Sequence, residues 1–182
     1  CLANYYQIPV FSELHWKAVA NFMECAASHG INMLLTPIFT PPLDTKEGGE
    51  RTTVQLVGVE KEGATYTFDF HLLERWIDLC IEKGIKYIEI SHLFTQWGAK
   101  YAPKVKKRMF GWDTPAVGGE YQRFLEQFLP ALKAFLREKG VFEHTYFHIS
   151  DEPHREEKET YAAAKNSVRE LLGDCKVIDA LS

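Results

Sequence analysis

Apolar residues recur along the chain at helical spacing in four segments. In the first segment, Ser12 is suited to cap the start of a helix and Gly30 to end it, and the apolar positions between them are Trp16, Val19, Ala20, Met23 and Ala27. The same spacing predicts a helix that begins after Asp69 and ends at Gly84, and two more over residues 119–139 and 155–172.

Short apolar runs lie between the helical segments and have the length of buried strands. They are Asn32–Thr36, Lys86–Ser91, His144–Ser150 and Lys176–Ala180. Strands that alternate with amphipathic helices are joined by right-handed crossovers and form a parallel sheet. The last of these strands would present an unpaired apolar edge.

One further segment departs from this alternation. Thr53–Glu60 and Ala64–Phe70 alternate in polarity and are rich in β-branched residues, and Lys61, Glu62 and Gly63 join them. This pattern predicts a β-hairpin inserted between the first two strands of the sheet.

The residues that follow the strands distinguish between two α/β architectures. An open nucleotide-binding sheet carries a glycine-rich turn between a strand and a helix, and none of these strands is followed by one. Polar, aromatic and acidic residues follow them instead, in Thr36–Pro42, Ser91–Phe94 and Ser150–Pro153. A (β/α)8 TIM-type barrel keeps its active site at these strand ends, and a closed one needs about 250 residues. Residues 1–182 are therefore predicted to form a partial barrel of about four strands with a β-hairpin insertion.

Composition and charge exclude several classes of protein. Of the 182 residues, 46% are hydrophobic and 13% aromatic, which is typical of one globular domain with a sizeable core. A net charge of −4 and a pI near 6.0 argue against nucleic acid as the partner. No run is long and apolar enough to span a bilayer. The compartment stays open between cytoplasmic and secreted or periplasmic.

The four cysteines are scattered and show no Cys-x-x-Cys or histidine-rich spacing. We therefore expect neither a metal nor a cofactor. Cys25 and Cys80 fall on apolar helix faces, and we expect both to be buried thiols. No leader precedes Cys1, and we interpret this start as a boundary inside a longer protein.

Asp151 and Glu152 are the most informative residues, because they follow an apolar strand directly. Two adjacent acids are costly if buried and unpaired, and Pro153 ends the strand so that the backbone can turn both carboxylates toward the barrel mouth. Neighbouring carboxylates divide into one that is ionised and one that holds a proton, which glycoside cleavage requires. The alternative is structural, since acids at this position would cap the helix over 155–172 and face its dipole.

In combination, four stretches resemble bacterial proteins with a glycoside hydrolase family 123-like catalytic domain. They are Thr36–Asp44 (TPIFTPPLD), Gly48–Gln55 (GGERTTVQ), Ser91–Ala99 (SHLFTQWGA) and His148–Pro153. The resemblance runs through most of the chain. It implies a barrel behind an N-terminal β-sandwich, with Cys1 just after the first barrel strand and the later strands beyond Ser182.

The resemblance also implies a chemistry. Members of this family are retaining β-N-acetylgalactosaminidases that use the acetamido oxygen of the substrate as the nucleophile, with an adjacent Asp-Glu after the fourth strand. By this resemblance Asp151 orients and stabilises the acetamido group, and Glu152 is the general acid and then the general base. Because the substrate supplies the nucleophile, no second carboxylate at a set distance is required. The implied partner is a carbohydrate.

Other residues are candidates for binding the sugar. His92 directly follows a predicted strand and can hydrogen-bond a sugar hydroxyl. Trp97 offers a ring on which a sugar can stack, with packing of the loop as an equal alternative. Arg51 either reaches the site or pairs with the neighbouring glutamate. By the resemblance, Asn4 and Tyr5 follow the first barrel strand and line the pocket.

Two other functions compete with this interpretation. The Glu-Pro pair also resembles the acid/base element of the large clan of retaining β-glycosidases, although Asp151 here occupies the place of an asparagine, and the nucleophile would lie on a later strand. A non-catalytic carbohydrate-binding barrel would keep His92 and Trp97 but has no need of two adjacent acids. In each case the remainder of the barrel is required, so the 182 residues alone are expected to be inactive.

Overall fold

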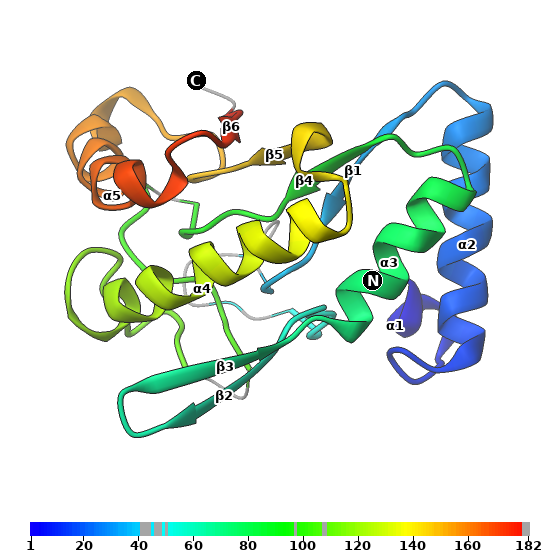
Figure 1. Ribbon diagram of the computed structural model, residues 1–182, viewed down its shortest axis with the longest axis horizontal. Coiled ribbons are helices and arrows are strands. Elements are labelled where there is room, and N and C mark those ends of the chain that lie inside the picture. The colour runs from blue at the N-terminus through cyan, green and yellow to red at the C-terminus, as the bar shows by residue number, and fades with distance from the viewer. Residues whose placement is uncertain (41–44, 46–48, 50, 97, 107–108, 180–182) are drawn as a thin grey trace.

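A computed structural model describes residues 1–40, 45, 49, 51–96, 98–106 and 109–179. Its sheet has four parallel strands in the order β1-β4-β5-β6 (Figure 1). They are β1 (Met33–Thr36), β4 (Tyr87–Ile90), β5 (Thr145–Phe147) and β6 (Lys176–Val177). Thr36 pairs with Ile90 and Glu89 with Tyr146, so the strands end along one edge of the sheet. This is the partial parallel sheet that the sequence predicts.

The predicted helices are confirmed, with small shifts at their ends. They are α2 (Glu13–Ser28), α3 (His71–Glu82), α4 (Gly119–Glu138) and α5 (Lys158–Leu172). A short helix that the sequence analysis did not predict, α1 (Leu2–Tyr6), precedes them, and two 3-10 turns, η1 (Phe142–His144) and η2 (Arg155–Glu157), are also present. Ser12 caps α2, because its hydroxyl accepts the N–H of His15 at 3.2 Å. Figure 1 shows α3 and α4 between α2 at one end of the molecule and α5 at the other.

The predicted hairpin is present, but its register differs from the expected one. Its strands are β2 (Gly58–Glu62) and β3 (Thr65–Asp69). Residues 53–57, which were predicted to belong to the first strand, do not pair with β3. Gln55 explains the later start, because its side chain accepts the N–H of Lys106 at 3.0 Å and so ties this stretch to another loop. The turn falls at Gly63, whose positive φ of 59° suits a glycine.

The core beside the hairpin consists largely of aromatic rings. The members of this aromatic cluster are Phe39, Tyr66, Phe68, Phe110, Tyr121, Phe124 and Phe128. Ring centroids of Phe39 and Phe128 lie 5.0 Å apart, a distance at which aromatic pairs stabilise beyond their buried area. Tyr121 also donates its hydroxyl proton to the carbonyl of Leu93. The cluster thus joins the hairpin and α4 to the loop that follows β4.

The long segment after β4 is packed, although the sequence predicts no regular structure for it. Isolated bridges pair Tyr101 with Pro115 and Val105 with Phe110, and several of its side chains are buried. Trp112 connects this segment to Gly49, since its indole Nε1 donates to the carbonyl of Gly49 at 2.8 Å.

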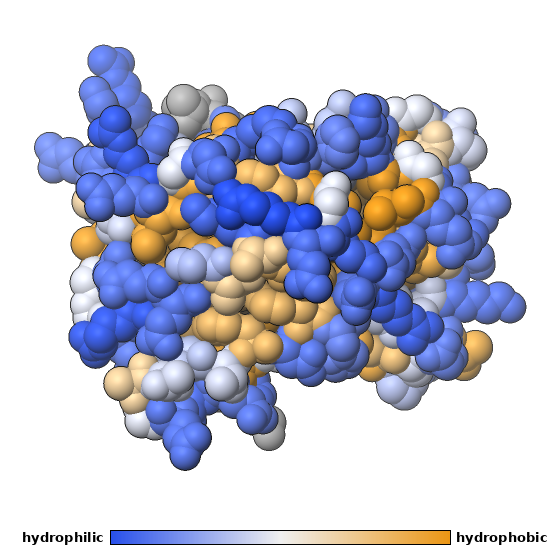
Figure 2. Space-filling view, in the orientation of Figure 1, coloured by the Kyte–Doolittle hydropathy of each residue, from blue (hydrophilic) through white to orange (hydrophobic). Residues whose placement is uncertain are grey.

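The surface carries both polar and apolar side chains. Figure 2 shows hydrophilic side chains over most of one face, with apolar surface between them. Strand β6 lies at an edge of the described sheet, and Val177 and the following Ile178 are exposed there. Strand β6 is shorter than the predicted strand Lys176–Ala180, of which Ala180 lies outside the described residues, and its edge is apolar at Val177.

The two cysteines predicted to be buried differ from each other. Cys80 is buried in the core, and burial raises the pKa of its thiol to about 12. The prediction for Cys25 is wrong, because this residue is exposed. Helix α2 buries Met23, and Cys25 lies two positions further, roughly 200° around the helix axis.

Candidate functional site

The segment after β5 is held against the segment after β4. The N–H of Leu93 donates to the carbonyl of His148 at 3.1 Å, and the hydroxyl of Ser150 donates to the carbonyl of Thr95 at 2.8 Å. These bonds continue the pairing of β4 and β5 beyond the strands. They fix the backbone immediately before Asp151.

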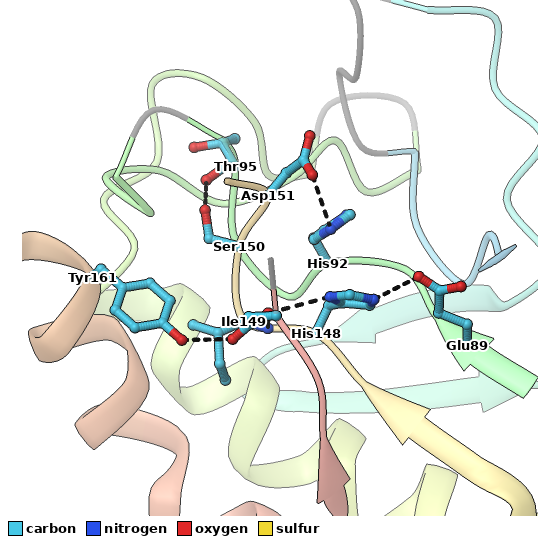
Figure 3. Close-up of polar contacts among 9 residues, drawn as sticks. Glu89, His92, Thr95, His148, Ile149, Ser150, Asp151 and Tyr161 are labelled. Carbon is cyan, nitrogen blue, oxygen red and sulfur yellow. Dashed lines mark hydrogen bonds and ion pairs between the residues drawn. The ribbon is translucent and has the colours of Figure 1, made fainter. Parts of the chain in front are cut away.

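Asp151 and His92 come together at the carboxyl edge of the sheet (Figure 3). Nε2 of His92 lies 3.8 Å from Oδ1 of Asp151. The imidazole is buried, whereas the side chain of Asp151 is 42% exposed. Asp151 thus lies partly against the buried ring of His92 and is partly exposed.

The segment after β1 meets the segment after β4 at the same edge. The N–H of Phe39, which follows β1, donates to the hydroxyl of Ser91 at 3.4 Å. Thr40 is buried, and its hydroxyl oxygen has no hydrogen-bond partner among the described residues. The segments after β1, β4 and β5 are thus adjacent, as parallel strands require.

The backbone turns sharply at Glu152. Its φ is 39°, in the left-handed region that side chains other than glycine rarely adopt. Such conformations cost free energy and are concentrated at functional sites. Glu152 is exposed and directly follows Asp151. The turn removes the strict alternation of side-chain direction that a strand would impose on the two acids.

Asp151 and Glu152 do not cap the next helix, which was the structural alternative for them. The helical segment starts at η2, and its N-cap is His154. Glu157 completes a capping box by accepting the N–H of His154 at 3.0 Å. Asp151 and Glu152 lie before this cap, so they are not needed to begin the helix.

His148 sits between two carboxylates beneath this edge. Its Nε2 lies 2.6 Å from Oε1 of Glu89, and its Nδ1 lies 3.2 Å from Oδ1 of Asp179. Burial disfavours the charged ring, but the hydrogen bonds to Asp179 and Glu89 and their negative charges outweigh it and raise the pKa of His148 to about 9. His148 is therefore an imidazolium at neutral pH.

Asp179 has two further donors. The hydroxyl of Tyr161 on α5 donates to Oδ2 at 2.6 Å, and the N–H of Ile149 donates to Oδ1 at 2.9 Å. This carboxylate takes the place of a backbone partner beside Ile149, which explains why β5 ends at Phe147 rather than at the predicted Ser150.

The pKa of His92 is shifted in the opposite direction to that of His148. The two rings lie 4.5 Å apart between centroids. Burial and the positive charge of His148 lower the pKa of His92 to about 4, although Asp179 and Glu89 act in the other direction. His92 is therefore neutral at physiological pH.

The sequence did not identify Glu89, Asp179 or Tyr161 as residues near the site. One signal was present, because Glu89 is a carboxylate inside the apolar run of a predicted strand. Asp179 carries the same signal, because it lies inside the predicted strand Lys176–Ala180, whereas nothing local distinguishes Tyr161 from surface residues.

The remaining predicted binding residues do not join Asp151 in one observed cluster. Arg51 is exposed and lines a cavity of about 290 Å³ together with Thr40 and Thr52. Asn4 donates to the hydroxyl of Thr52 at 2.7 Å, so it lies beside this cavity. Tyr5 is 80% exposed.

Trp97 lies outside the described residues, as do parts of the motifs over 36–44 and 48–55. Within the described part of the chain, no helix is long and apolar enough to cross a membrane. The same residues contain no group of three or more histidine, cysteine or acidic side chains arranged to hold a metal ion.

Comparison with known proteins identifies a family and a solved structure of similar fold. The model of the family described as glycoside hydrolase 123, catalytic domain, matches residues 1–182. The fold is similar to that of a family 123 glycoside hydrolase from Clostridium perfringens, whose structural analysis concerns glycolipid glycan hydrolysis, with 19% sequence identity and a TM-score of 0.71. The match covers 98% of this chain and 32% of that chain, so the chain spans about a third of that enzyme's length. No curated protein matches.

Proposed function

Because the chain belongs to the family of glycoside hydrolase 123 catalytic domains, we propose that it carries the two catalytic carboxylates of a retaining glycosidase for 2-acetamido sugars. The pair is Asp151 and Glu152. One observation carries the assignment: Asp151 lies 3.8 Å from a buried histidine at the carboxyl edge of the sheet, half-exposed to a ligand. The substrates that fit are β-N-acetylhexosaminides, foremost β-N-acetylgalactosaminides.

In this proposal, Asp151 acts on the acetamido group of the substrate. As an anion it orients the group so that its oxygen attacks the anomeric carbon, and it stabilises the positive charge that develops on the cyclic intermediate. The hydrogen bonds around Ser150 support this role, because they fix the backbone that carries the carboxylate. A fixed anion needs no reorganisation when the charge develops.

Glu152 then serves as general acid and afterwards as general base. It protonates the glycosidic oxygen as the bond breaks, and it later takes a proton from the water that opens the cyclic intermediate. Its exposure and the left-handed turn of its backbone support this role, since the carboxyl group is accessible to a leaving group. The net result is retention at the anomeric carbon.

Binding of the sugar is assigned to residues from several loops. His92 is proposed to hydrogen-bond the substrate beside Asp151, and Trp97 to stack on the sugar ring. Arg51, Asn4 and Tyr5 are proposed to extend the binding surface on the side of β1. The partial barrel over 1–182 is completed, in this proposal, by further strands and an N-terminal β-sandwich. The relative from Clostridium perfringens makes glycans of glycolipids natural substrates to test.

The test compares aryl β-N-acetylgalactosaminides and β-N-acetylglucosaminides with the corresponding plain β-hexosides. The protein that contains this chain should cleave only the acetamido sugars and release the β-anomer first, and Glu152→Gln should abolish assistance to poor leaving groups. Glu156→Gln is the matched control, because it removes a nearby exposed carboxylate in the same way.

Two outcomes would overturn the proposal. Equal cleavage of plain hexosides would place the nucleophile on another strand, as in the large glycosidase clan. Binding of glycans without turnover of any aryl glycoside would indicate a non-catalytic barrel.

A further inference from the structure

The ionisable side chains at the candidate active site lie in three layers. The lowest is His148 with Glu89 and Asp179 on either side, the next is His92, and Asp151 is the outermost (Figure 3). The side chains of His148 and Asp179 are 9% and 5% exposed and that of Glu89 is 27% exposed, so the lowest layer is largely shielded from water.

We propose that His148 is a positioning residue that keeps the adjacent His92 neutral and protonated on Nε2, so that His92 presents an N–H to Asp151 without neutralising its charge. The consequence for catalysis rests on the function proposed above. The protonation states themselves follow from the contacts of the two rings.

The partners of His148 require it to carry two protons. Both ring nitrogens approach a carboxylate oxygen, Nε2 that of Glu89 and Nδ1 that of Asp179. An ionised carboxylate only accepts hydrogen bonds, so each nitrogen must donate. Such charge-assisted bonds are roughly twice as strong as neutral ones. The ring is therefore an imidazolium that its two carboxylates hold in place.

The surroundings of His92 favour a neutral ring. Its ring centroid lies 4.5 Å from that of His148, and a second positive charge at this distance in a buried site is unfavourable. Its Nδ1 is buried and has no hydrogen-bond partner among the described residues. An imidazolium would leave a buried N–H unpaired there, whereas the neutral ring can place its one proton on Nε2, toward Asp151.

Among the described residues, three charged groups shift the protonation of His92. His148 opposes protonation of His92, while Glu89 on β4 and Asp179 after β6 favour it. Asp151 lies on the outer side, 3.8 Å from Nε2. Removing the charge of His148 alone would leave the negative groups in place. His92 would then gain a proton at a higher pH and form an ion pair with Asp151.

This ion pair would matter for the proposed reaction. An anion beside a neutral donor can stabilise a developing positive charge fully, whereas an anion already paired with an imidazolium stabilises it less. His148 therefore acts through His92, and neither it nor its two carboxylates has to touch the substrate.

The test is a pH titration of the histidine rings by NMR in the protein that contains this chain, labelled with 13Cε1-histidine. In the wild type, His92 should stay neutral down to about pH 4 and His148 should stay charged up to about pH 9. In His148→Gln, the midpoint of His92 should rise by about one pH unit or more. The control Tyr161→Phe removes one hydrogen bond to Asp179 but no charge, and it should leave His92 unchanged.

A wild-type His92 that titrates near 6.5, or a midpoint that His148→Gln leaves unmoved, would overturn the inference. The wild-type titration decides the question even where His148→Gln does not fold. If the titrations are as expected but no glycoside is cleaved, the proposed function fails while the protonation states stand.

Discussion

Replacing His148 with glutamine also measures how much stability its charged ring supplies. The ordinary pKa of a histidine is 6.5, and that of His148 in the folded protein is about 9. Because the folded value is the higher one, the charge stabilises the fold fully below pH 6.5, and this stabilisation is lost as the pH rises through about 9. A difference of about 2.5 pH units at roughly 1.4 kcal/mol each corresponds to about 3 kcal/mol. The ring is buried, so solvent screening reduces this little.

Urea unfolding at a series of pH values, followed by circular dichroism, checks this magnitude. The free energy of unfolding of the wild type should exceed that of His148→Gln by about 3 kcal/mol more at pH 6 than at pH 9. Tyr161→Phe is the control, since its difference from the wild type should not change over this range. If the free energies of unfolding of the wild type and of His148→Gln fall in parallel as the pH rises, the reasoning is refuted.

Three further predictions concern the site and its supporting loop. Glu152→Gln should lower kcat/KM by about 10²–10⁴-fold for poor leaving groups and much less for activated aryl groups, so a plot of rate against leaving-group pKa should steepen. Asp151→Asn should lower kcat/KM for all leaving groups alike, and an unchanged rate with any of them would contradict its role. Gly98→Ala should lower the free energy of unfolding by about 1–3 kcal/mol in urea titrations, because φ is +78° and a Cβ there would lie 2.8 Å from both Glu157 Cβ and Thr160 Oγ1.

The sequence alone determined the order and type of the main elements. Ser12 caps the start of α2, and the spacing of the apolar residues in α2 determines which face of the helix is buried. Both signals act within a few residues of the chain. Asp151 could be placed at a functional edge for a similar reason. The carboxyl ends of parallel strands lie together, so a polar residue after a strand has a known neighbourhood even before the structure is seen.

Some local details could not be predicted because they depend on contacts between distant segments. The start of β2 is set by the bond between Gln55 and Lys106. The local pattern allowed the predicted start at Thr53, and a partner elsewhere in the chain selected a later one. The exposure of Cys25, in contrast, follows from its place on the helix, roughly 200° around the axis from the buried Met23.

The histidine network was decided by the tertiary structure alone. Glu89, His148 and Asp179 come from segments after or within three different strands, and no spacing in the sequence links them. In the unfolded chain, His148 would have the ordinary pKa of a histidine, 6.5. Only when the sheet brings them within hydrogen-bonding distance, away from water, do their charges act on each other strongly enough to separate the protonation states of His148 and His92.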